Sequence, residues 1–418
     1  MSKFIINGPS NLSGEIKVNG AKNNALKVLA ASLLSKNEIT INNIPQIEDV
    51  NRMRELLEDL GACVKKREDN LLITSENINK TEIDELLARK LRTSILLVGP
   101  LLARFGQAKF PHPGGCVIGK RPIDIFLKGF ESLGADIKET KNHYAITAKG
   151  GLKGAKIVFP HVSVTATESL MMTATLAKGI TTLCNAAMEP EIPAIADYLN
   201  RQGAKIIGAG TPCITIEGVE KIGAGSYNVI PDRIEAGTFA IMGVLTNSEI
   251  KIADCEPEHL EVLFEKLRQM GAQLEIGDTY VKTKKHNGLH AVDIRTHEYP
   301  GFPTDLQAPF TLLLTQAQGM SLVHETVFEG RLFYTDVLNT MGANIIMCDP
   351  HRIVLHGPTK LYGKKLISPD LRAGITMALA GLIAEGETVI DNIYQIERGY
   401  EKIDERLRSL GAKIERVE

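Results

Sequence analysis

The sequence predicts an α/β protein of two domains, each an inside-out barrel in which strands and polar helices surround a core of buried helices. Three observations lead to this prediction. A unit of about 70 residues recurs six times, each unit carries one polar and one almost uncharged helical stretch, and a β-branched run follows the uncharged stretch. With 418 residues and 44% hydrophobic content, the chain can fill two cores, with three units in each domain.

The repeat is marked by the dipeptide Gly-Ala, which follows a large residue at the end of each polar helical stretch. Its glycines are Gly61, Gly134, Gly203, Gly271, Gly342 and Gly411. Successive glycines are 73, 69, 68, 71 and 69 residues apart. Spacing this regular indicates six copies of one supersecondary unit.

Each unit also contains a helical stretch that is almost free of charge. A helix that is hydrophobic on every face must be covered on every side, which places these stretches inside the domains. They span residues 25–34, 93–103, 169–177, 236–245, 306–317 and 373–384. A breaker and a β-branched run follow, as in residues 36–41, 178–183 and 385–390.

The midpoint of the repeat falls near residues 227–231, where we place a hinge. Residues 22–229 are then expected to form the first domain, and residues 1–21 with 230–418 the second. The strand-like N-terminal residues precede the first unit, so we expect them to complete a sheet of the second domain. The active site is expected in the cleft between the domains, because ligand sites favour such interfaces.

Composition excludes several functional classes. Forty-eight basic and 50 acidic residues leave a net charge of -2, which is not the electrostatic footprint of a nucleic-acid-binding protein. The N-terminus lacks the long apolar core of a signal peptide, and the longest uncharged run, residues 306–323, contains glutamines and a proline. We therefore expect a cytoplasmic protein without a membrane span, in which any anion site is local.

The six cysteines include no Cys-x-x-Cys pair, so reduced thiols and no metal site are predicted. Five of them are expected to act as small hydrophobes in strand-like or apolar stretches: Cys63, Cys184, Cys213, Cys255 and Cys348. Cys116 differs, because it lies in a loop of prolines and glycines near Lys120 and Arg121. Such surroundings favour a reactive thiol, and a structural loop cysteine is the alternative.

Charged residues stand just before the uncharged helical stretches, at Lys22 with Asn23, Arg92, Arg233, Asp305, and Asp370 with Arg372. Their similar placement suggests one shared rim, where helix N-termini and these cations bind phosphate or carboxylate. Ordinary helix boundaries are the alternative, since a structural repeat also places its caps periodically. Asp305 is interpreted as a helix cap or as a general base. Arg331 and Arg398 each stand close to a glutamate in the sequence and are interpreted as members of weak surface ion pairs.

Short motifs along the whole chain resemble those of the enolpyruvyl transferases. They occupy residues 19–24, 113–116, 119–122, 231–235, 301–305, 370–373 and 397–400. The resemblance implies two inside-out α/β domains and no metal or organic cofactor. It also implies transfer of the enolpyruvyl group of phosphoenolpyruvate to the 3'-hydroxyl of UDP-N-acetylglucosamine, by addition and then elimination of phosphate, the first committed step of peptidoglycan synthesis.

The resemblance assigns roles to matching positions of this chain. Cys116 would donate a proton to phosphoenolpyruvate and can form a covalent adduct with it, or with an epoxide phosphonate such as fosfomycin, and Asp305 would take the hydroxyl proton. Lys22, Arg121 and Arg398 would hold phosphoenolpyruvate, and Lys22 and Arg398 belong to the catalytic set. The UDP-sugar would contact Asn23, Arg92, Arg121, Pro122, Ile123, Asp124, Ile125, Ser163, Val164, Thr165, Asp305 and Val327, and the charged cleft would include Arg233, Arg331, Asp370 and Arg372.

Two positions depart from the family pattern. His112 replaces an expected leucine, and Thr165 replaces an expected glycine, which could alter a close backbone contact to the nucleotide.

Two alternative functions stay open. One is the sister enzyme acting on shikimate 3-phosphate, whose pattern lacks the cysteine loop. The other is a non-catalytic sugar-nucleotide-binding protein, against which the presence of Lys22, Cys116, Asp305 and Arg398 argues.

Overall fold

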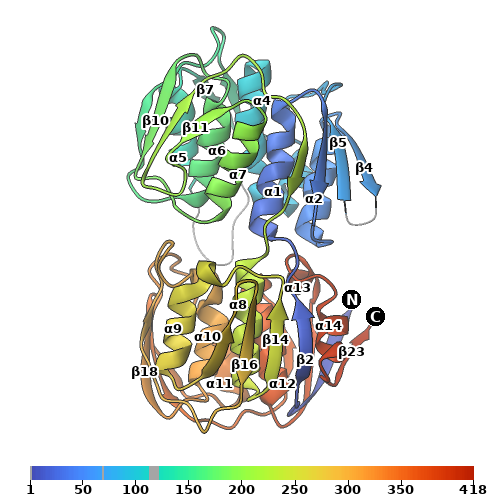
Figure 1. Cartoon of the computed structure of the whole chain (residues 1–418), viewed down its shortest axis with the longest axis vertical. Helices are drawn as coiled ribbons and strands as arrows, with labels where there is room; N and C mark the ends of the chain where they lie inside the picture. The colour runs from blue at the N-terminus through green and yellow to red at the C-terminus, as the bar shows by residue number, and fades with distance from the viewer. Residues whose placement is uncertain (1, 68–69, 113–121) are drawn as a thin grey trace. The chain divides into compact units, whose positions relative to one another are not determined.

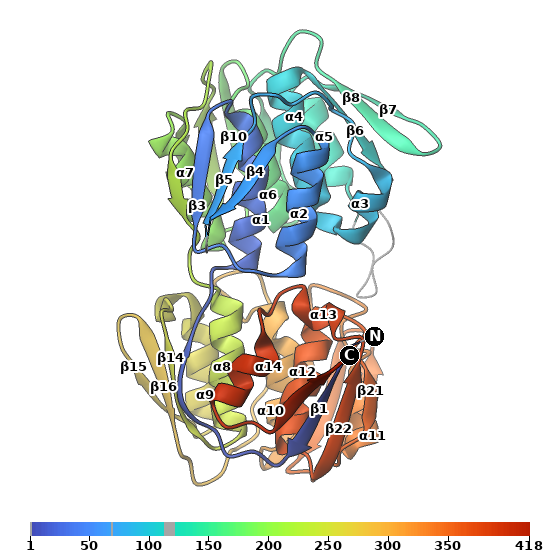
Figure 2. The same ribbon diagram turned by 90° about the vertical axis from the view of Figure 1, so that its right-hand side faces the viewer.

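The computed structural model describes residues 2–67, 70–112 and 122–418 (Figure 1). The chain divides into two compact units, each with its own hydrophobic core. Residues 20–112 and 122–230 belong to the N-terminal unit, and residues 2–19 and 231–418 belong to the C-terminal unit. In each unit, three sheets and a set of outer helices surround three buried helices, as Figure 2 shows for the sheets on the outside of both units.

The N-terminal unit is built around the buried helices α1 (Lys22–Ala31), α4 (Val98–Phe105) and α6 (Val164–Ala174). Its sheets have the strand orders β13-β3-β5-β4, β6-β8-β7 and β11-β12-β10-β9. The strands are β3 (Glu38–Asn42), β4 (Cys63–Arg67), β5 (Asn70–Thr74), β6 (Gln107–Pro111), β7 (Asp136–Glu139), β8 (His143–Thr147), β9 (Lys156–Val158), β10 (Ile180–Cys184), β11 (Lys205–Ile207), β12 (Cys213–Glu217) and β13 (Ser226–Asn228). The other helices are η1 (Ser32–Leu34), α2 (Glu48–Asp59), α3 (Glu85–Lys90), η2 (Arg92–Leu97), α5 (Asp124–Ser132) and α7 (Glu191–Arg201).

The C-terminal unit repeats this plan around α8 (Arg233–Leu245), α10 (Gln307–Leu314) and α12 (Leu371–Ile383). Its sheets have the orders β21-β22-β1-β23, β15-β16-β14-β2 and β17-β18-β20-β19. The strands are β1 (Lys3–Gly8), β2 (Ser13–Lys17), β14 (Glu249–Ala253), β15 (Gln273–Ile276), β16 (Tyr280–Lys284), β17 (Ile294–Arg295), β18 (Gly319–His324), β19 (Ile345–Asp349), β20 (Arg352–Gly357), β21 (Lys365–Ile367), β22 (Gly386–Asp391) and β23 (Ile414–Val417). The other helices are η3 (Pro257–Leu260), α9 (Glu261–Gln269), η4 (Thr304–Leu306), α11 (Thr335–Met341), α13 (Tyr394–Glu397) and α14 (Ile403–Ser409).

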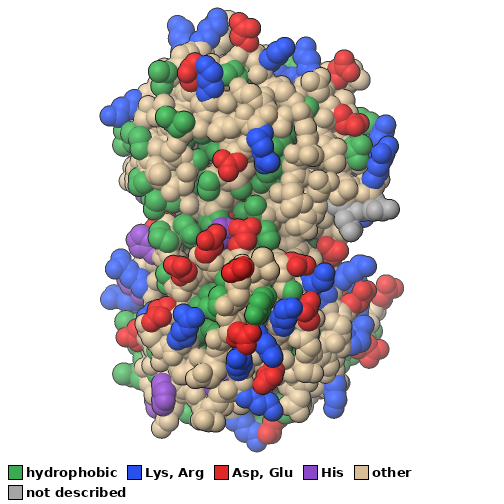
Figure 3. Space-filling model, viewed as in Figure 1, with side chains coloured by type: hydrophobic (Ala, Val, Ile, Leu, Met, Phe, Trp, Pro, Cys, Tyr) green, Lys and Arg blue, Asp and Glu red, His purple; other side chains and the backbone are tan. Residues whose placement is uncertain are grey.

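The predicted arrangement of strands outside and helices inside is confirmed. Each of the six uncharged stretches coincides with one of the buried helices, and β1 and β2 pair with strands of the C-terminal unit, β1 with β22 and β23 and β2 with β14. Within the described residues the sheets of a unit remain separate, so strand pairing does not close a continuous barrel. Within the same residues, no helix combines the length and the apolar character that crossing a membrane requires. Basic and acidic side chains are interspersed over the face shown in Figure 3.

The recurring Gly-Ala dipeptide ends the outer helices in one common way. All six glycines have a positive φ, from +90° at Gly134 to +115° at Gly342. At the end of α5, the N–H of Gly134 donates to the carbonyl of Glu131 at 2.9 Å, and the N–H of Ala135 donates to the carbonyl of Phe130 at 3.0 Å. This is the Schellman arrangement, which requires a left-handed residue after the helix and therefore favours glycine there.

Replacing Gly134 by alanine tests the conformational origin of the repeat. An added Cβ has open space within 4 Å, so the cost comes from the left-handed backbone alone, and we expect a loss of about 1 kcal/mol in the free energy of unfolding. Urea denaturation measures this loss. Gly150→Ala is the matched control, because Gly150 also has open space but lacks a left-handed φ. Equal stability of the two variants would contradict the explanation.

Two charged side chains are buried between helices that the sequence predicts to be almost uncharged. Lys27 of α1 and Glu168 of α6 form an ion pair with an Nζ–Oε2 distance of 3.2 Å, and their side chains are only 5% and 0% exposed. Helix α6 begins at Val164, earlier than the predicted residue 169, and therefore includes Glu168. Burial raises the pKa of Glu168 to about 8, Lys27 opposes this shift, and Glu191 and Glu189 add to it.

The raised pKa of Glu168 predicts a pH-dependent stability. The folded state holds the proton more tightly than the unfolded state, whose carboxyl has the ordinary pKa of 4.5. The contribution of protonated Glu168 to the free energy of unfolding is therefore fully present below pH 4.5 and is lost as the pH rises towards about 8. The free energy of unfolding falls by at most about 1.4 kcal/mol per pH unit in this range. Urea denaturation between pH 5 and about pH 8 measures it. The reference is Lys27→Met with Glu168→Met, which lacks this slope, and equal pH dependence of both proteins would refute the assignment.

The prediction that five cysteines act as small buried hydrophobes is wrong for most of them. Cys255 is buried, whereas Cys63, Cys213 and Cys348 are exposed and Cys184 is partly exposed. Apolar neighbours identify a strand, but successive side chains point to opposite faces, and these four side chains lie on faces away from the core. Cys116 lies outside the described residues.

Candidate active site

Asp305 is held by two arginines in the C-terminal unit. It lies in the short turn η4 before α10, and its Oδ1 accepts a hydrogen bond from Nη1 of Arg331 at 2.8 Å. Its Oδ2 accepts one from Nη2 of Arg372 at 2.9 Å. Both arginine side chains are buried, whereas the carboxylate side chain is 24% exposed. The arrangement presents a fixed, accessible carboxylate between two guanidinium groups.

The charges of this cluster determine its protonation. Burial alone would raise the pKa of Asp305, but the charges of Arg372 and Arg331 and their hydrogen bonds outweigh it and hold the pKa well below the ordinary value. For Arg372, burial lowers the pKa, but the charge of Asp305, the smaller effects of Tyr400 and Asp232, and the hydrogen bond to Asp305 together outweigh burial and raise the pKa. The carboxylate therefore stays ionised near neutral pH, where it is a strong hydrogen-bond acceptor and a weak base.

Glu325 organises the segments that carry Asp305 and Arg331. Its buried carboxylate accepts hydrogen bonds from Oγ1 of Thr304 at 2.8 Å and from the backbone N–H groups of Val327 and Phe328 at 2.8 and 3.1 Å. Thr304 in turn accepts a hydrogen bond from Nη1 of Arg331 at 2.8 Å. The sequence prediction missed Glu325 and Thr304. A charged residue directly after the apolar strand β18 is the sequence signal that would have identified Glu325.

Arg372 is positioned by the start of α12. Asp370 caps this helix, with its Oδ1 accepting hydrogen bonds from the N–H groups of Arg372 and Ala373 at 2.8 and 3.0 Å. Nη1 of Arg372 donates to the hydroxyl of the buried Tyr400 at 3.2 Å, and that hydroxyl also bonds with Oγ1 of Thr238 at 2.9 Å. Helix geometry and a buried hydroxyl network therefore hold this guanidinium in place.

Three further predicted residues lie in the same unit. The guanidinium of the half-buried Arg233 stands over the ring of Tyr299, 5.8 Å from its centroid. Nη1 of Arg398 donates to Oε1 of Gln395 at 3.1 Å, and the Val327 side chain is 36% exposed.

The structure decides between the alternatives for Asp305 and Arg331. The helix-cap interpretation of Asp305 is wrong, because its oxygens bond to arginine side chains and the position before the turn is Pro303. The surface ion-pair interpretation of Arg331 is also wrong, because this side chain is buried against Asp305 and Thr304. The sequence alone shows neither how deeply an arginine side chain is buried nor which residue it contacts, and both facts determine its role.

In the N-terminal unit, Lys22 begins α1 and is fixed by a residue that the sequence prediction missed. Its Nζ lies 3.1 Å from Oδ2 of Asp49, a buried residue in the first turn of α2, and the Lys22 side chain is only 13% exposed. Oδ1 of Asn24, in the same turn of α1, accepts a hydrogen bond from the hydroxyl of Tyr227 at 2.7 Å. Asn23 at the start of α1 and Arg92 at the start of η2 are half-buried.

The remaining predicted positions lie at the starts of α5 and α6. In residues 122–125, the side chains of Ile123 and Ile125 belong to the core, whereas Pro122 is exposed and Asp124 is partly exposed. Ser163 caps α6 by accepting a hydrogen bond from the N–H of Ala166 at 3.4 Å, and Val164 and Thr165 are half-buried.

Cys116 and Arg121 lie outside the described residues. The ring of His112, which departs from the family pattern, packs edge-on against Tyr144.

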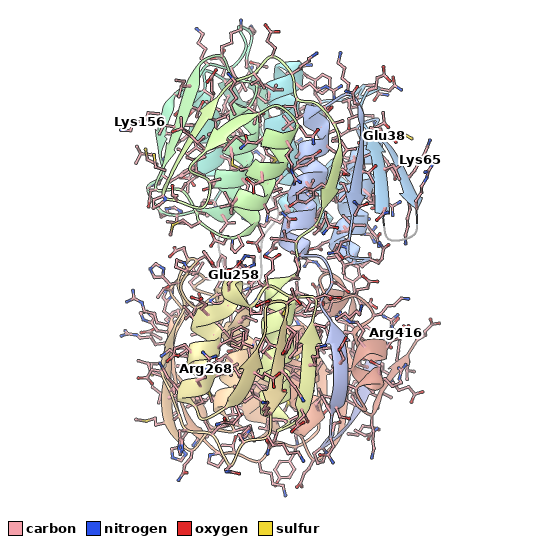
Figure 4. All side chains as sticks on the ribbon, in the orientation of Figure 1. Glu38, Lys65, Lys156, Glu258, Arg268 and Arg416 are labelled. Carbon is pink, nitrogen blue, oxygen red and sulfur yellow. The ribbon has the colours of Figure 1, made fainter. Side chains whose placement is uncertain are left out.

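One group among the described residues has the composition of a metal site: the side chains of Glu256, Glu258 and His259 place one ligand atom each within 4.8 Å of one another. Glu258 is labelled in Figure 4. His259 Nε2 lies 3.1 Å from an oxygen of Glu256, an ordinary pairing that accounts for this contact.

Comparisons with known proteins agree along the whole chain. The model of the EPSP synthase (3-phosphoshikimate 1-carboxyvinyltransferase) family matches residues 6–407. The chain is 45% identical over 419 residues to the UDP-N-acetylglucosamine 1-carboxyvinyltransferase of Solibacter usitatus (strain Ellin6076), with 100% of each chain covered. It is 44% identical over 418 residues to the protein of that name from Cronobacter sakazakii (strain ATCC BAA-894), covering 100% of this chain and 99% of the other.

Solved structures share the fold. The enolpyruvyl transferase NikO from Streptomyces tendae superposes with a TM-score of 0.90 at 23% identity, covering 100% of this chain and 99% of that chain. EPSP synthase from Acinetobacter baumannii superposes with a TM-score of 0.76 at 18% identity, with 100% of both chains covered. At these identities the likeness concerns the fold alone.

Proposed function

Because the chain belongs to the EPSP synthase family of enolpyruvyl transferases, we propose that it transfers the enolpyruvyl group of phosphoenolpyruvate to the 3'-hydroxyl of UDP-N-acetylglucosamine. Phosphate is the second product, and the enolpyruvyl sugar nucleotide feeds peptidoglycan synthesis. The choice of acceptor rests on the full-length identity to relatives named for this reaction. Among observations of the site, the carboxylate of Asp305 between Arg331 and Arg372 supports it most directly.

The reaction sets three chemical requirements. C3 of phosphoenolpyruvate must gain a proton, which makes C2 electrophilic. The sugar hydroxyl must lose a proton as its oxygen bonds to C2, and phosphate must then leave while a C3 proton is removed. Phosphoenolpyruvate is multiply anionic throughout, so fixed cations are needed to bind it and to stabilise the departing phosphate.

Lys22, Arg121 and Arg398 are the cations that we assign to phosphoenolpyruvate. Lys22 suits this role because Asp49 fixes its ammonium group at the start of α1, which keeps the side chain from adopting other rotamers. The start of α1 also offers backbone N–H groups and the positive end of the helix dipole to an anion.

The geometry of Asp305 refines its role as the base. A carboxylate with a strongly lowered pKa has little driving force to deprotonate a free hydroxyl, but it orients that hydroxyl well by accepting its hydrogen bond. The hydroxyl becomes far more acidic as its oxygen bonds to C2. We therefore assign Asp305 to orienting the acceptor first and taking its proton late in the addition step.

The UDP-sugar is assigned to half-buried positions, to the exposed Val327 and to backbone groups. Asn23, Arg92 and Val327 offer side chains, and so do Asp124 and the start of α6 at residues 163–165. Ile123 and Ile125 have core side chains, so at these positions only the backbone is available to the nucleotide. Arg233 and Asp370 complete the charged surroundings, Asp370 through its cap of α12.

Phosphate release from phosphoenolpyruvate tests the function. The purified full-length chain is assayed with UDP-N-acetylglucosamine, with shikimate 3-phosphate and with neither acceptor. Release that depends on the UDP-sugar supports the proposal, whereas release that depends on shikimate 3-phosphate supports the sister reaction. Binding of the UDP-sugar without release with either acceptor supports a non-catalytic binding protein.

Two substitutions at Cys116 test its role as the proton donor. We expect Cys116→Asp to retain activity within about tenfold and Cys116→Ser to lose about 100-fold or more, because a carboxylic acid can donate a proton and a serine hydroxyl hardly can. The measurement is the steady-state rate of phosphate release for both variants. Similar rates for the two would refute the acid role. A mass increase at Cys116 after exposure to fosfomycin separately tests the proposed covalent modification.

A further inference from the structure

Two cysteines outside the proposed active site face each other across neighbouring strands. Cys184 is the last residue of β10 and Cys213 is the first residue of β12, and the antiparallel register places them directly opposite. Both are free thiols. They lie 29 residues apart in the sequence, so a sequence search for closely spaced cysteines does not find the pair.

The register makes this a close pair. The ladder of β10 and β12 begins with Ile180 opposite Glu217. One position before it, the N–H of Gly218 donates to the carbonyl of Gly179 at 2.9 Å, which makes Gly179 and Gly218 a hydrogen-bonded pair. Hydrogen-bonded and non-hydrogen-bonded pairs alternate along an antiparallel ladder, so Cys184 and Cys213 form a non-hydrogen-bonded pair. Cα atoms of such pairs are about 4.5 Å apart, within the span of about 4.4–6.8 Å that a disulfide bridges.

Both thiols lie on the face of the sheet that points away from the core. The neighbouring Leu183 and Ile214 are fully buried, so the alternate positions point outward, where Cys213 is exposed and Cys184 is partly exposed. Lys156 of β9 shares this outward face, and Figure 4 shows its side chain extending away from the ribbon. A small reagent in solution can therefore reach the pair.

We propose that Cys184 and Cys213 form a reversible intramolecular disulfide by exchange with a low-molecular-weight disulfide such as glutathione disulfide. The thiolate of one cysteine attacks the reagent, forming a mixed disulfide and releasing one thiolate. The second cysteine, as its thiolate, then attacks the protein sulfur of the mixed disulfide and displaces the other thiolate. Overall, two protein thiols are oxidised and one disulfide is reduced to two thiols, with both protons passing to the released thiolates.

The bond would constrain a defined part of the N-terminal unit. It closes the chain around residues 185–212, which contain the whole of α7. Helix α7 contacts both α1, which begins at Lys22, and α6, which Ser163 caps. A cross-link around such a segment reduces the freedom of the unfolded chain, so the oxidised protein should be the more stable form.

Oxidation of the full-length protein tests the inference. The reduced chain has six cysteines, and after exposure to glutathione disulfide we expect a population with a linked peptide that joins Cys184 to Cys213 in the digest. Dithiothreitol should abolish this link, and the oxidised form should melt about 5 °C higher than the reduced form. Cys63→Ser is the matched control, because it removes an exposed strand cysteine outside the pair and should preserve the link.

Cys184→Ser and Cys213→Ser separate this bond from any reaction at Cys116. Each should abolish the linked peptide and leave the remaining cysteine with a single glutathione adduct. Two separate adducts on Cys184 and Cys213 of the unsubstituted protein would overturn the proposal. Recovery of both as free thiols, under conditions that oxidise a short peptide containing two cysteines, would also overturn it.

Discussion

Asp305→Asn is expected to reduce kcat by about 10³-fold, with a much smaller change in KM. The amide has nearly the shape of the carboxylate, but it cannot accept the proton of the acceptor hydroxyl. It also leaves Arg331 and Arg372 without their shared anion, so both guanidinium groups are free to bind substrate oxygens too tightly or in the wrong place. The steady-state rate of phosphate release, with both substrates varied, measures the split between kcat and KM.

The control for this variant is Asp349→Asn, which removes a carboxylate that pairs with Arg352 at the surface and should leave the kinetics unchanged. Calorimetric titration with UDP-N-acetylglucosamine shows whether the Asp305 variant is folded and binds its substrate. A folded, substrate-binding variant with kcat within about tenfold of the unsubstituted protein would contradict the assigned role.

Lys27→Met is expected to lower the free energy of unfolding of the N-terminal unit by about 3 kcal/mol at about pH 10, where Glu168 is ionised in the unsubstituted protein but stays protonated in the variant. Methionine fills a similar volume, but the substitution leaves Glu168 buried without its cation. Glu191 and Glu189 increase the cost, because both already disfavour the charged form of Glu168. Urea denaturation at fixed pH measures the effect, and lowering the pH to about 5 should remove much of the difference, because Glu168 is then protonated in both proteins.

The double variant with Lys27→Met and Glu168→Met separates the lost pair from lost packing. Replacing both partners removes the buried charges together, so at the same pH its loss of stability should be much smaller than that of Lys27→Met. Lys251→Met is the surface control, because Lys251 pairs with Glu15 where both side chains are more than 40% exposed, and little change is expected. A double variant as unstable as Lys27→Met would show that packing, rather than charge, dominates.

The two ion-pair systems show how far the sequence predicts a site. The family resemblance assigned Asp305, Arg331 and Arg372 to the site. The partners of Asp305 are 26 and 67 residues away in the sequence, and the sequence did not predict that these three side chains meet. Asp49, Thr304 and Glu325 were missed because each looks like an ordinary polar residue at the end of an element. Their roles come from buried hydrogen bonds that only the folded chain forms.

The sequence by itself determined the repeat, the succession of uncharged helix, strand and polar helix in each unit, and the placement of the uncharged helices inside. These features are local and periodic: glycine at a left-handed helix end, apolar residues on all faces of a helix, and β-branched runs each leave a signature within a few residues. Tertiary structure alone decided which charges pair and which strand faces are exposed. Asp305 between two arginines, Lys27 against Glu168 and the facing thiols of Cys184 and Cys213 depend on contacts between distant segments and on the phase of each strand.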